Sequence, residues 1–188
     1  ILLVVNLPSD EILSRQKKGS SIIGLLNPYD NQKSFDHFKN RSLNAFSMEL
    51  VPRITRAQSM DVLSSQANLS GYRAVITATS LYSKSMAMMM TAAGTVAPAK
   101  VFVMGVGVAG LQAIATAKRL GAVVSATDVR RAAAEQCESL GASFIMVETE
   151  DDAEDETGYA KEMSDEYKEK QRQLISNHVK QQDIICLL

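Results

Sequence analysis

The chain of 188 residues has almost no excess of charge, with 20 lysines and arginines against 21 aspartates and glutamates. A formal net charge of −1 gives no general attraction to nucleic acid or to an anionic membrane surface, so we expect no nucleic-acid partner. No uninterrupted apolar segment approaches the roughly 20 residues that a membrane-spanning helix needs. A composition with 46% hydrophobic and 22% charged residues is typical of a soluble globular protein.

Cysteine and histidine are also scarce. The cysteines, Cys137 and Cys186, lack C-x-x-C spacing and have no nearby histidine with which to complete a metal set. We interpret both as reduced thiols that face the core, and we predict no metal site. The histidines, His37 and His178, lie in predicted amphipathic helices among charged neighbours, which indicates surface positions.

Short β-type runs alternate with helix-length stretches along most of the chain, which is typical of parallel sheets with crossover helices. The N-terminal third predicts strands near residues 1–6, 20–26 and 43–48. A long helix is then expected from about residue 60 to residue 90, with a break near Gly71, followed by a hinge at "GTVAPAK". The C-terminal half predicts strands at 100–105, 122–127, 143–147 and 183–188, and helices at 108–120, 131–140 and 164–180.

Three glycines stand between a predicted strand and a predicted helix in "KVFVMGVGVAGLQAIATAKRL". Gly105, Gly107 and Gly110 have the spacing G-x-G-x-x-G, in the context that a dinucleotide-binding fingerprint requires. Gly105 would permit a tight turn, Gly107 would let the backbone approach a pyrophosphate, and Gly110 would let the helix pack closely on the strand. Free N–H groups at the helix start would bind the anion. A glycine-rich turn without a ligand is the alternative.

The next predicted strand ends in Asp128, 18 residues after Gly110, where a carboxylate can accept hydrogen bonds from the adenosine ribose. Its charge would repel the 2′-phosphate of NADP, so the sequence favours NAD(H) as the cofactor. Arg130 and Arg131 follow at once and could accept a phosphate, which keeps NADP as an alternative. The cofactor-binding candidates in these two motifs are Gly105, Gly107, Val108, Ala109, Gly110, Asp128, Val129 and Arg130.

A second polar group, Arg53, Arg56, Gln58 and Asp61, lies at the start of the predicted long helix. Ser59 could cap that helix and Asp61 suits its positive first turn, so a structural role explains the pattern as well as a functional one. In the functional interpretation, this loop hydrogen-bonds the carboxamide of a nicotinamide and orients its ring.

The sequence offers no clear base for a substrate that carries an O–H or N–H proton. Removal of hydride from an alcohol or an amino acid requires such a base. Hydride transfer between two nicotinamides requires only that the rings be brought together with water excluded. The lack of a base is therefore expected if the cofactor reacts with another nicotinamide.

Several segments together carry a resemblance to a known family: "VPRITRAQSMDVLSSQANLSGYRAV", "MMMTAAGTVAPAKVFVMGVGVAGLQAIATAKRLGA", "ATDVR", "EQCESLGA" and "GYAKEMSDE". They resemble the NAD(H)-binding component of proton-translocating nicotinamide nucleotide transhydrogenase, from about residue 43 to the end of the chain. The resemblance implies an α/β protein of two Rossmann-type domains with doubly wound parallel sheets. We expect part of the first domain at residues 1–60, a linking helix and hinge at 61–97, and a NAD-binding domain at 98–188. Because the chain begins and ends on apolar strands, we expect it to be a piece of a longer protein, truncated at its C-terminal side.

The resemblance also implies roles and partners. The loop that matches Arg53, Gln58 and Asp61 contacts the nicotinamide end of the cofactor, Ser64 lies nearby, and Asp128 meets the adenosine ribose. The segment that matches Gly158, Tyr159 and Ala160 is a mobile lid. Hydride would pass from NADH to NADP⁺ on a separate NADP(H)-binding component, coupled to proton movement by a membrane-spanning component. We further expect a homodimer on the cytoplasmic face of a bacterial membrane or the matrix side of a mitochondrial one.

Two other functions remain open from the sequence. An alanine-dehydrogenase-like oxidoreductase would share the fold and the glycine-rich unit, but its counterpart lacks "GYAKEM", and "SIIGLLNPYD" here has no histidine to serve as an acid or base. A module that binds NAD without catalysis is the third interpretation. Turnover of an amino acid would indicate the dehydrogenase, and hydride exchange with a second nicotinamide cofactor would indicate the transhydrogenase. Cofactor binding without any turnover would indicate the binding module.

Overall fold

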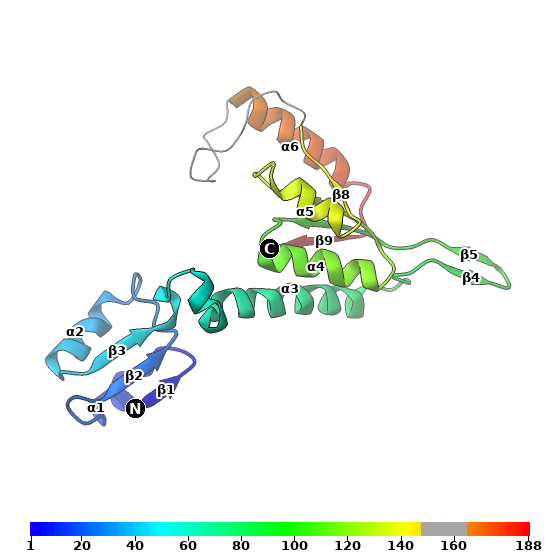
Figure 1. Ribbon diagram of the computed structural model, residues 1–188. Helices are drawn as coiled ribbons and strands as arrows, with labels where there is room; N and C mark the ends of the chain where they lie inside the picture. The colour runs from blue at the N-terminus through cyan, green and yellow to red at the C-terminus, as the bar shows by residue number, and fades with distance from the viewer. Residues whose placement is uncertain (148–164) are drawn as a thin grey trace. The chain divides into compact units, whose positions relative to one another are not determined.

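The chain folds as two compact units, unit 1 at Ile1–Ser65 and unit 2 at Gln66–Leu188. The computed structural model describes residues 1–147 and 165–188. Each unit has a parallel sheet of its own (Figure 1). Each also has its own hydrophobic core.

Unit 1 contains a parallel sheet in the order β1-β2-β3. Its strands are β1 (Leu2–Val4), β2 (Ser21–Gly24) and β3 (Asn44–Ser47), joined by α1 (Asp10–Ser14) and α2 (Gln32–Asn40). The core consists of buried apolar side chains from the strands and the segments that join them, namely Leu13, Ile22, Leu26, Phe38 and Leu43. Each strand lies within a range that the sequence predicts. Two 3₁₀ turns, η1 (Met48–Leu50) and η2 (Thr55–Met60), then lead to α3 (Val62–Leu81).

Unit 2 contains a four-stranded parallel sheet in the order β8-β7-β6-β9. Its elements are β6 (Lys100–Met104), α4 (Val108–Arg119), β7 (Val123–Thr127), α5 (Ala133–Ser139), β8 (Ser143–Phe144), α6 (Asp165–Val179) and β9 (Ile184–Leu187). The chain moves outward from β6 to β8 and then returns to place β9 on the other side of β6. The predicted doubly wound α/β fold is thereby confirmed, and its strand order reverses between β6 and β9.

The two faces of this sheet are covered by different helices (Figure 1). Alternate residues of a strand point to opposite faces. Val101 and Val103 of β6 share one core cluster with Ile114 of α4, whereas the ring of Phe102 contacts His178 of α6 on the other face. The cysteines, Cys137 and Cys186, are free thiols buried in the core, as predicted.

The long helix is shorter than the sequence predicts. Helix α3 ends at Leu81, and the methionine-rich run enters an antiparallel hairpin of β4 (Met89–Thr91) and β5 (Gly94–Val96). Gly94 adopts a φ of +130°, which L-residues with a side chain rarely adopt and which the turn requires. The segment predicted as a hinge therefore contains a strand. Methionine favours helices on its own, and cross-strand pairing overrides that preference.

Gly71 does not break α3; it permits a close approach between two helices. A Cβ added at Gly71 would lie 2.0 Å from the backbone oxygen of Ala109 in α4. The contact is supported at one side by a hydrogen bond from Asn68 Nδ2 to Gln112 Oε1 at 3.2 Å. The glycine is thus required by packing rather than by local backbone conformation.

We predict that Gly71→Ala lowers the free energy of unfolding by about 1–3 kcal/mol, because the added methyl overpacks the contact with α4. In an exposed helix the same change would stabilise by about 1 kcal/mol, so the sign of the effect is diagnostic. Chemical denaturation measures it, with Ser70→Ala at the exposed neighbouring position as the control. A Gly71→Ala protein more stable than the parent would contradict the close approach.

His178 is not the surface residue that the sequence predicts. Its Nε2 lies 2.7 Å from Ser125 Oγ of β7, and its ring packs edge-on against Phe102, with 4.8 Å between ring centroids. Burial, with a smaller contribution from the charge of Lys100, lowers the pKa of His178 below its ordinary value. The histidine therefore lies on the face of α6 that meets the sheet, where Ser125 is its hydrogen-bond partner. His37 of α2, by contrast, is exposed as predicted.

We predict that protonation of His178 weakens the docking of α6. Because the pKa of His178 is lowered in the folded state, the unfolded chain binds more protons as the pH falls below the ordinary histidine value of about 6.5. The free energy of unfolding should therefore decrease with falling pH in that range. His178→Gln should flatten the decrease. Denaturant titrations between about pH 5 and 8 measure the slope, and equal slopes for the parent and His178→Gln would refute this role.

Candidate functional site

The turn between β6 and α4 has the geometry that the glycine spacing predicts. Gly105 has a φ of +99°, so it makes a turn that a residue with a side chain would strain. A Cβ at Gly110 would lie 1.8 Å from the backbone oxygen of Gly105, which shows that α4 packs directly against the turn. Among residues 1–147 and 165–188, no atom beyond its neighbours in the chain lies within 4 Å of a Cβ built at Gly107. These residues therefore leave open space in front of the first residues of α4.

This open space lies where an α/β sheet commonly binds its ligand. The turn follows the carboxyl end of β6, at the position where the strand order reverses between β6 and β9. Gly107 is the N-cap of α4, and the N–H groups of the first helical turn, from Val108 to Gly110, have no acceptor within the helix. Such N–H groups and the positive end of the helix dipole favour an anion. The arrangement suits the pyrophosphate of a dinucleotide.

Asp128 lies directly after β7 and reaches the glycine turn. The backbone N–H of Val106 donates a hydrogen bond to Asp128 Oδ2 at 2.7 Å. The backbone N–H of Arg130 donates to Oδ1 at 2.9 Å, and its side chain donates from Nε to Oδ1 at 3.0 Å and from Nη2 to Oδ2 at 3.2 Å. The carboxylate thus joins the end of β7 to the turn, and it is itself paired with Arg130.

The charge on Asp128 is stabilised by these donors. Burial alone would raise the pKa of Asp128, since only 7% of its side chain is exposed. The hydrogen bonds from the side chain and the N–H of Arg130 and from the N–H of Val106 outweigh the burial and lower the pKa below its ordinary value. Asp128 is therefore an ionised acceptor at neutral pH, suited to bind hydroxyl groups and unsuited to accept a proton.

The other candidates in unit 2 surround this carboxylate or the turn. Val108 and Val129 are exposed, and the half-exposed Arg130 also directs Nη2 toward the backbone oxygen of Val106 at 3.4 Å. Val106 is a residue that sequence reasoning missed, because it acts through its backbone N–H and its identity carries no signal. Gly158, Tyr159 and Ala160 lie outside the described residues.

The polar loop of unit 1 lines a small pocket of its own. Its volume is about 280 Å³, and it is lined by Pro52, Arg53, Ile54, Thr55, Gln58 and Asp61. The three loop residues predicted from the family resemblance therefore share one pocket. Arg56 is exposed and does not line it.

Asp61, not Ser59, caps α3. Helix α3 begins at Val62, and Asp61 Oδ1 accepts a hydrogen bond from the backbone N–H of Ser64 at 2.9 Å, while Ser64 Oγ donates to Asp61 Oδ2 at 2.7 Å. Ser59 lies within η2, before the helix begins. The two hydrogen bonds from Ser64, helped by the positive charge of Arg53, lower the pKa of Asp61. The predicted site residue Ser64 is thus the partner that holds Asp61 in place.

We predict that the cap and any role of Asp61 toward a cofactor can be separated by substitution. Asp61→Ala removes the acceptor for the Ser64 N–H and should lower the melting temperature, whereas Asp61→Asn keeps an acceptor and should lower it less. Thermal unfolding of the parent and both variants at neutral pH measures this. An Asp61→Ala protein as stable as the parent would show that the cap contributes nothing measurable.

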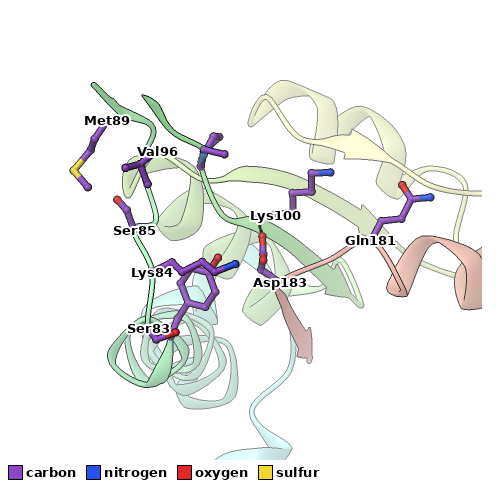
Figure 2. A pocket seen from close by; sticks show the side chains of 11 residues that line it. Ser83, Lys84, Ser85, Met89, Val96, Lys100, Gln181 and Asp183 are labelled. Carbon is purple, nitrogen blue, oxygen red and sulfur yellow. Dashed lines mark hydrogen bonds between the residues drawn. The ribbon is translucent and has the colours of Figure 1, made fainter. Parts of the chain in front are cut away.

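A larger pocket of about 740 Å³ lies at the opposite end of the strands of unit 2 (Figure 2). It lies where β6 and β9 begin, between the loop after α3 and the base of the β4–β5 hairpin. Asp183 accepts a hydrogen bond from the backbone N–H of Lys100 at 2.9 Å and another from the hydroxyl of Tyr82, which together lower its pKa. Its carboxylate therefore serves to hold this junction together. Parallel α/β sheets bind ligands at the carboxyl ends of their strands, whereas this pocket lies at the amino ends. The glycine turn therefore remains the candidate site.

Among residues 1–147 and 165–188, no helix has the length and apolar character that crossing a membrane requires. In the same residues, no three histidine, cysteine or carboxylate side chains gather closely enough to hold a metal ion.

The sheet, the crossovers and the turn define a Rossmann-like protein. The sequence matches both domains of one family, "Alanine dehydrogenase/PNT": the N-terminal domain over residues 1–70 and the C-terminal domain over residues 74–187. The chain belongs to this family.

Individual relatives agree with that assignment. A protein of Rickettsia prowazekii that forms the first portion of an NAD(P) transhydrogenase subunit alpha is 53% identical over 169 residues, which are 90% of this chain and 44% of the relative. The crystal structure of transhydrogenase from Sinorhizobium meliloti matches with a TM-score of 0.86 and 54% identity, covering 97% of this chain and 49% of that one. An L-alanine dehydrogenase matches with a TM-score of 0.60 and 19% identity, over 74% of this chain and 40% of that one, and so shares the fold. This chain spans about half the length of the proteins that it matches.

Proposed function

We propose that this chain is the NAD(H)-binding component of a proton-translocating transhydrogenase. The observation that carries the proposal is the ionised Asp128 beside an open glycine turn at the reversal point of a Rossmann-like sheet. Membership of the alanine dehydrogenase/PNT family and 53% identity to a transhydrogenase alpha subunit support the transhydrogenase reaction.

The residues of unit 2 fit the adenosine end of a dinucleotide. The first turn of α4 would bind the pyrophosphate, Gly107 leaves room for it, and Asp128 would accept hydrogen bonds from the ribose hydroxyls. Under the same proposal Arg53, Gln58 and Asp61 contact the nicotinamide end, Ser64 supports Asp61, and Gly158, Tyr159 and Ala160 cover the cofactor. When bound, the nicotinamide would supply the hydride, and the protein would hold the nicotinamide ring in position.

The protonation states of the candidate carboxylates favour a nicotinamide acceptor over an amino acid. Asp61 and Asp128, the two candidate carboxylates, both have lowered pKa values and both accept hydrogen bonds from neighbouring donors. Neither is suited to remove a proton from a substrate near neutral pH. Exchange of hydride between two nicotinamides needs no such group.

The proposed reaction requires partners. We propose that hydride passes to NADP⁺ held by an NADP(H)-binding component, that a membrane-spanning component couples the exchange to proton movement, and that this component acts as a homodimer. It would work at the cytoplasmic face of a bacterial membrane or at the matrix side of a mitochondrial inner membrane.

We predict that the full-length protein containing this chain binds NADH more tightly than NADPH and has no activity alone. Addition of the NADP(H)-binding component should produce hydride exchange, measured with NADPH as donor and an NAD analogue that absorbs at a distinct wavelength as acceptor. Asp128→Ala should raise the Kd for NADH because the ribose loses its acceptor. Reduction of NAD⁺ by L-alanine without the partner would identify an alanine-dehydrogenase-like enzyme instead, and absence of turnover with every acceptor would identify a binding module.

A further inference from the structure

In unit 1, the carboxylate of Glu49 joins the loop after β2 to the segment that leads into the 280 Å³ pocket. The backbone N–H of Asn27 donates to Glu49 Oε1 at 2.6 Å, and Ser47 Oγ donates to Oε2 at 2.5 Å. We propose that Glu49 is a positioning residue, which fixes the start of the pocket loop and so holds Arg53 in place for a nicotinamide. The inference rests on the proposed function and deepens it, since it assigns a role in nicotinamide binding to a residue that does not line the pocket.

The loop after β2 is a firm anchor because its shape is set by contacts of its own. Leu26, next to Asn27, is fully buried in the core of unit 1. Asn27 has a φ of +45°, a left-handed conformation that asparagine tolerates better than most residues with a side chain. Its Nδ2 donates to Asp30 Oδ2 at 2.9 Å, and its backbone oxygen accepts from the N–H of Asn31 at 3.2 Å. The N–H that meets Glu49 is therefore fixed in direction.

Only a short and stiff stretch separates Glu49 from the pocket. Glu49 lies in η1, which ends at Leu50, and the pocket lining begins at Pro52. Val51, between them, has a φ of −61° and a ψ of 124°, the extended conformation that a following proline favours. The ring of Pro52 fixes its own φ. A displacement of Glu49 would therefore be passed on to Pro52 and Arg53 rather than absorbed between them.

The pocket loop is thus held at both ends by a carboxylate. At the far end, Asp61 accepts two hydrogen bonds from Ser64 at the start of α3. At the near end, Glu49 accepts from the loop after β2. Arg53 and Gln58, which we propose to contact the nicotinamide, lie between these two points. Because a small displacement of a positioning group can weaken a contact strongly, the loss of either end should impair nicotinamide binding.

The carboxylate of Glu49 is suited to holding the loop rather than to transferring a proton. Burial alone would raise the pKa of Glu49, but the hydrogen bonds from Ser47 and from the N–H of Asn27 outweigh it and lower the pKa. A glutamine would keep an acceptor for the N–H of Asn27, and the hydroxyl of Ser47 can accept from the glutamine amide. The role should therefore depend on hydrogen bonding and not on the charge.

Two ligands that differ at the nicotinamide test this role in the full-length protein that contains this chain. NADH and ADP-ribose share the adenosine and the pyrophosphate, so the ratio of their Kd values, measured by calorimetry, reports the contacts of the nicotinamide. The parent should prefer NADH. Glu49→Met keeps the length of the side chain and removes both acceptors, and it should reduce this preference by about three- to tenfold, the scale of one hydrogen bond. Glu49→Gln should retain most of the preference.

Matched variants separate positioning from a general loss of stability. Glu11→Met makes the same replacement at an exposed carboxylate of α1, and Ile22→Val removes a methyl group from the core of unit 1. Neither should change the preference for NADH. In Glu49→Met combined with Arg53→Ala, the loss of preference should be smaller than the product of the two single losses, because Glu49 acts through the loop that carries Arg53.

Three results would overturn the inference. Glu49→Met could keep the full preference for NADH, Glu49→Gln could lose as much of it as Glu49→Met, or the double variant could show the full product of the single losses. If Glu49→Met fails to fold by circular dichroism, Ser47→Ala replaces it, since it removes one of the two donors to Glu49. Ser47→Ala should show a smaller loss of preference, and no loss would count equally against the inference.

Binding by the parent distinguishes failure of the inference from failure of the proposed function. A parent that binds neither NADH nor ADP-ribose overturns both. A parent that binds the two ligands equally overturns the role of the pocket loop toward the nicotinamide, and this inference with it. A parent that prefers NADH, with a preference that survives in Glu49→Met, overturns the inference alone.

Discussion

Unit 2 depends on close contacts between backbones that have no side chain between them. At Gly110, α4 approaches the oxygen of Gly105 so closely that a Cβ would lie 1.8 Å from it, and at Gly71, α3 approaches Ala109 in the same way at 2.0 Å. The first contact sets the N-terminus of α4 against the end of β6, and the second sets α3 against the outer side of α4. The N–H groups of the first turn of α4, the glycine turn and Asp128 are consequently held in place by packing.

Much of this fold follows from local pattern, and the exceptions have tertiary causes. The strands and crossovers around Gly105 were predictable because each apolar run is short and is followed by a helix-length amphipathic segment. The methionine-rich run was not, because its fate depends on pairing between Met89 and Val96 rather than on its own preference. His178 faces the sheet, where it is hydrogen-bonded to Ser125 of β7. The sequence pattern of α6 alone cannot reveal a partner on another strand.

The candidate site shows the same division. The backbone requirement for glycine at positions 105 and 110 is visible in the sequence, because only one residue type meets it. The choice between Ser59 and Asp61 as the cap depended on where the helix begins, and helix ends are the least predictable part of an element. For Arg130, the sequence permits either a phosphate ligand or a partner for Asp128. The loop conformation after β7 decides for the latter, by bringing a side chain two residues away back onto the carboxylate.

The two candidate carboxylates lie in different units, yet they are built alike. Asp61 is fixed by the N–H and the hydroxyl of Ser64, and Asp128 is fixed by Val106 and Arg130, so each is an oriented, ionised acceptor rather than a base. A group whose charge is stabilised in this way can discriminate between ligands and hold them, but it gains little by accepting a proton. Each of these two carboxylates is therefore equipped to recognise and orient a ligand. Under the proposed function, in which hydride passes between two nicotinamide cofactors, recognition and orientation are what the protein has to supply.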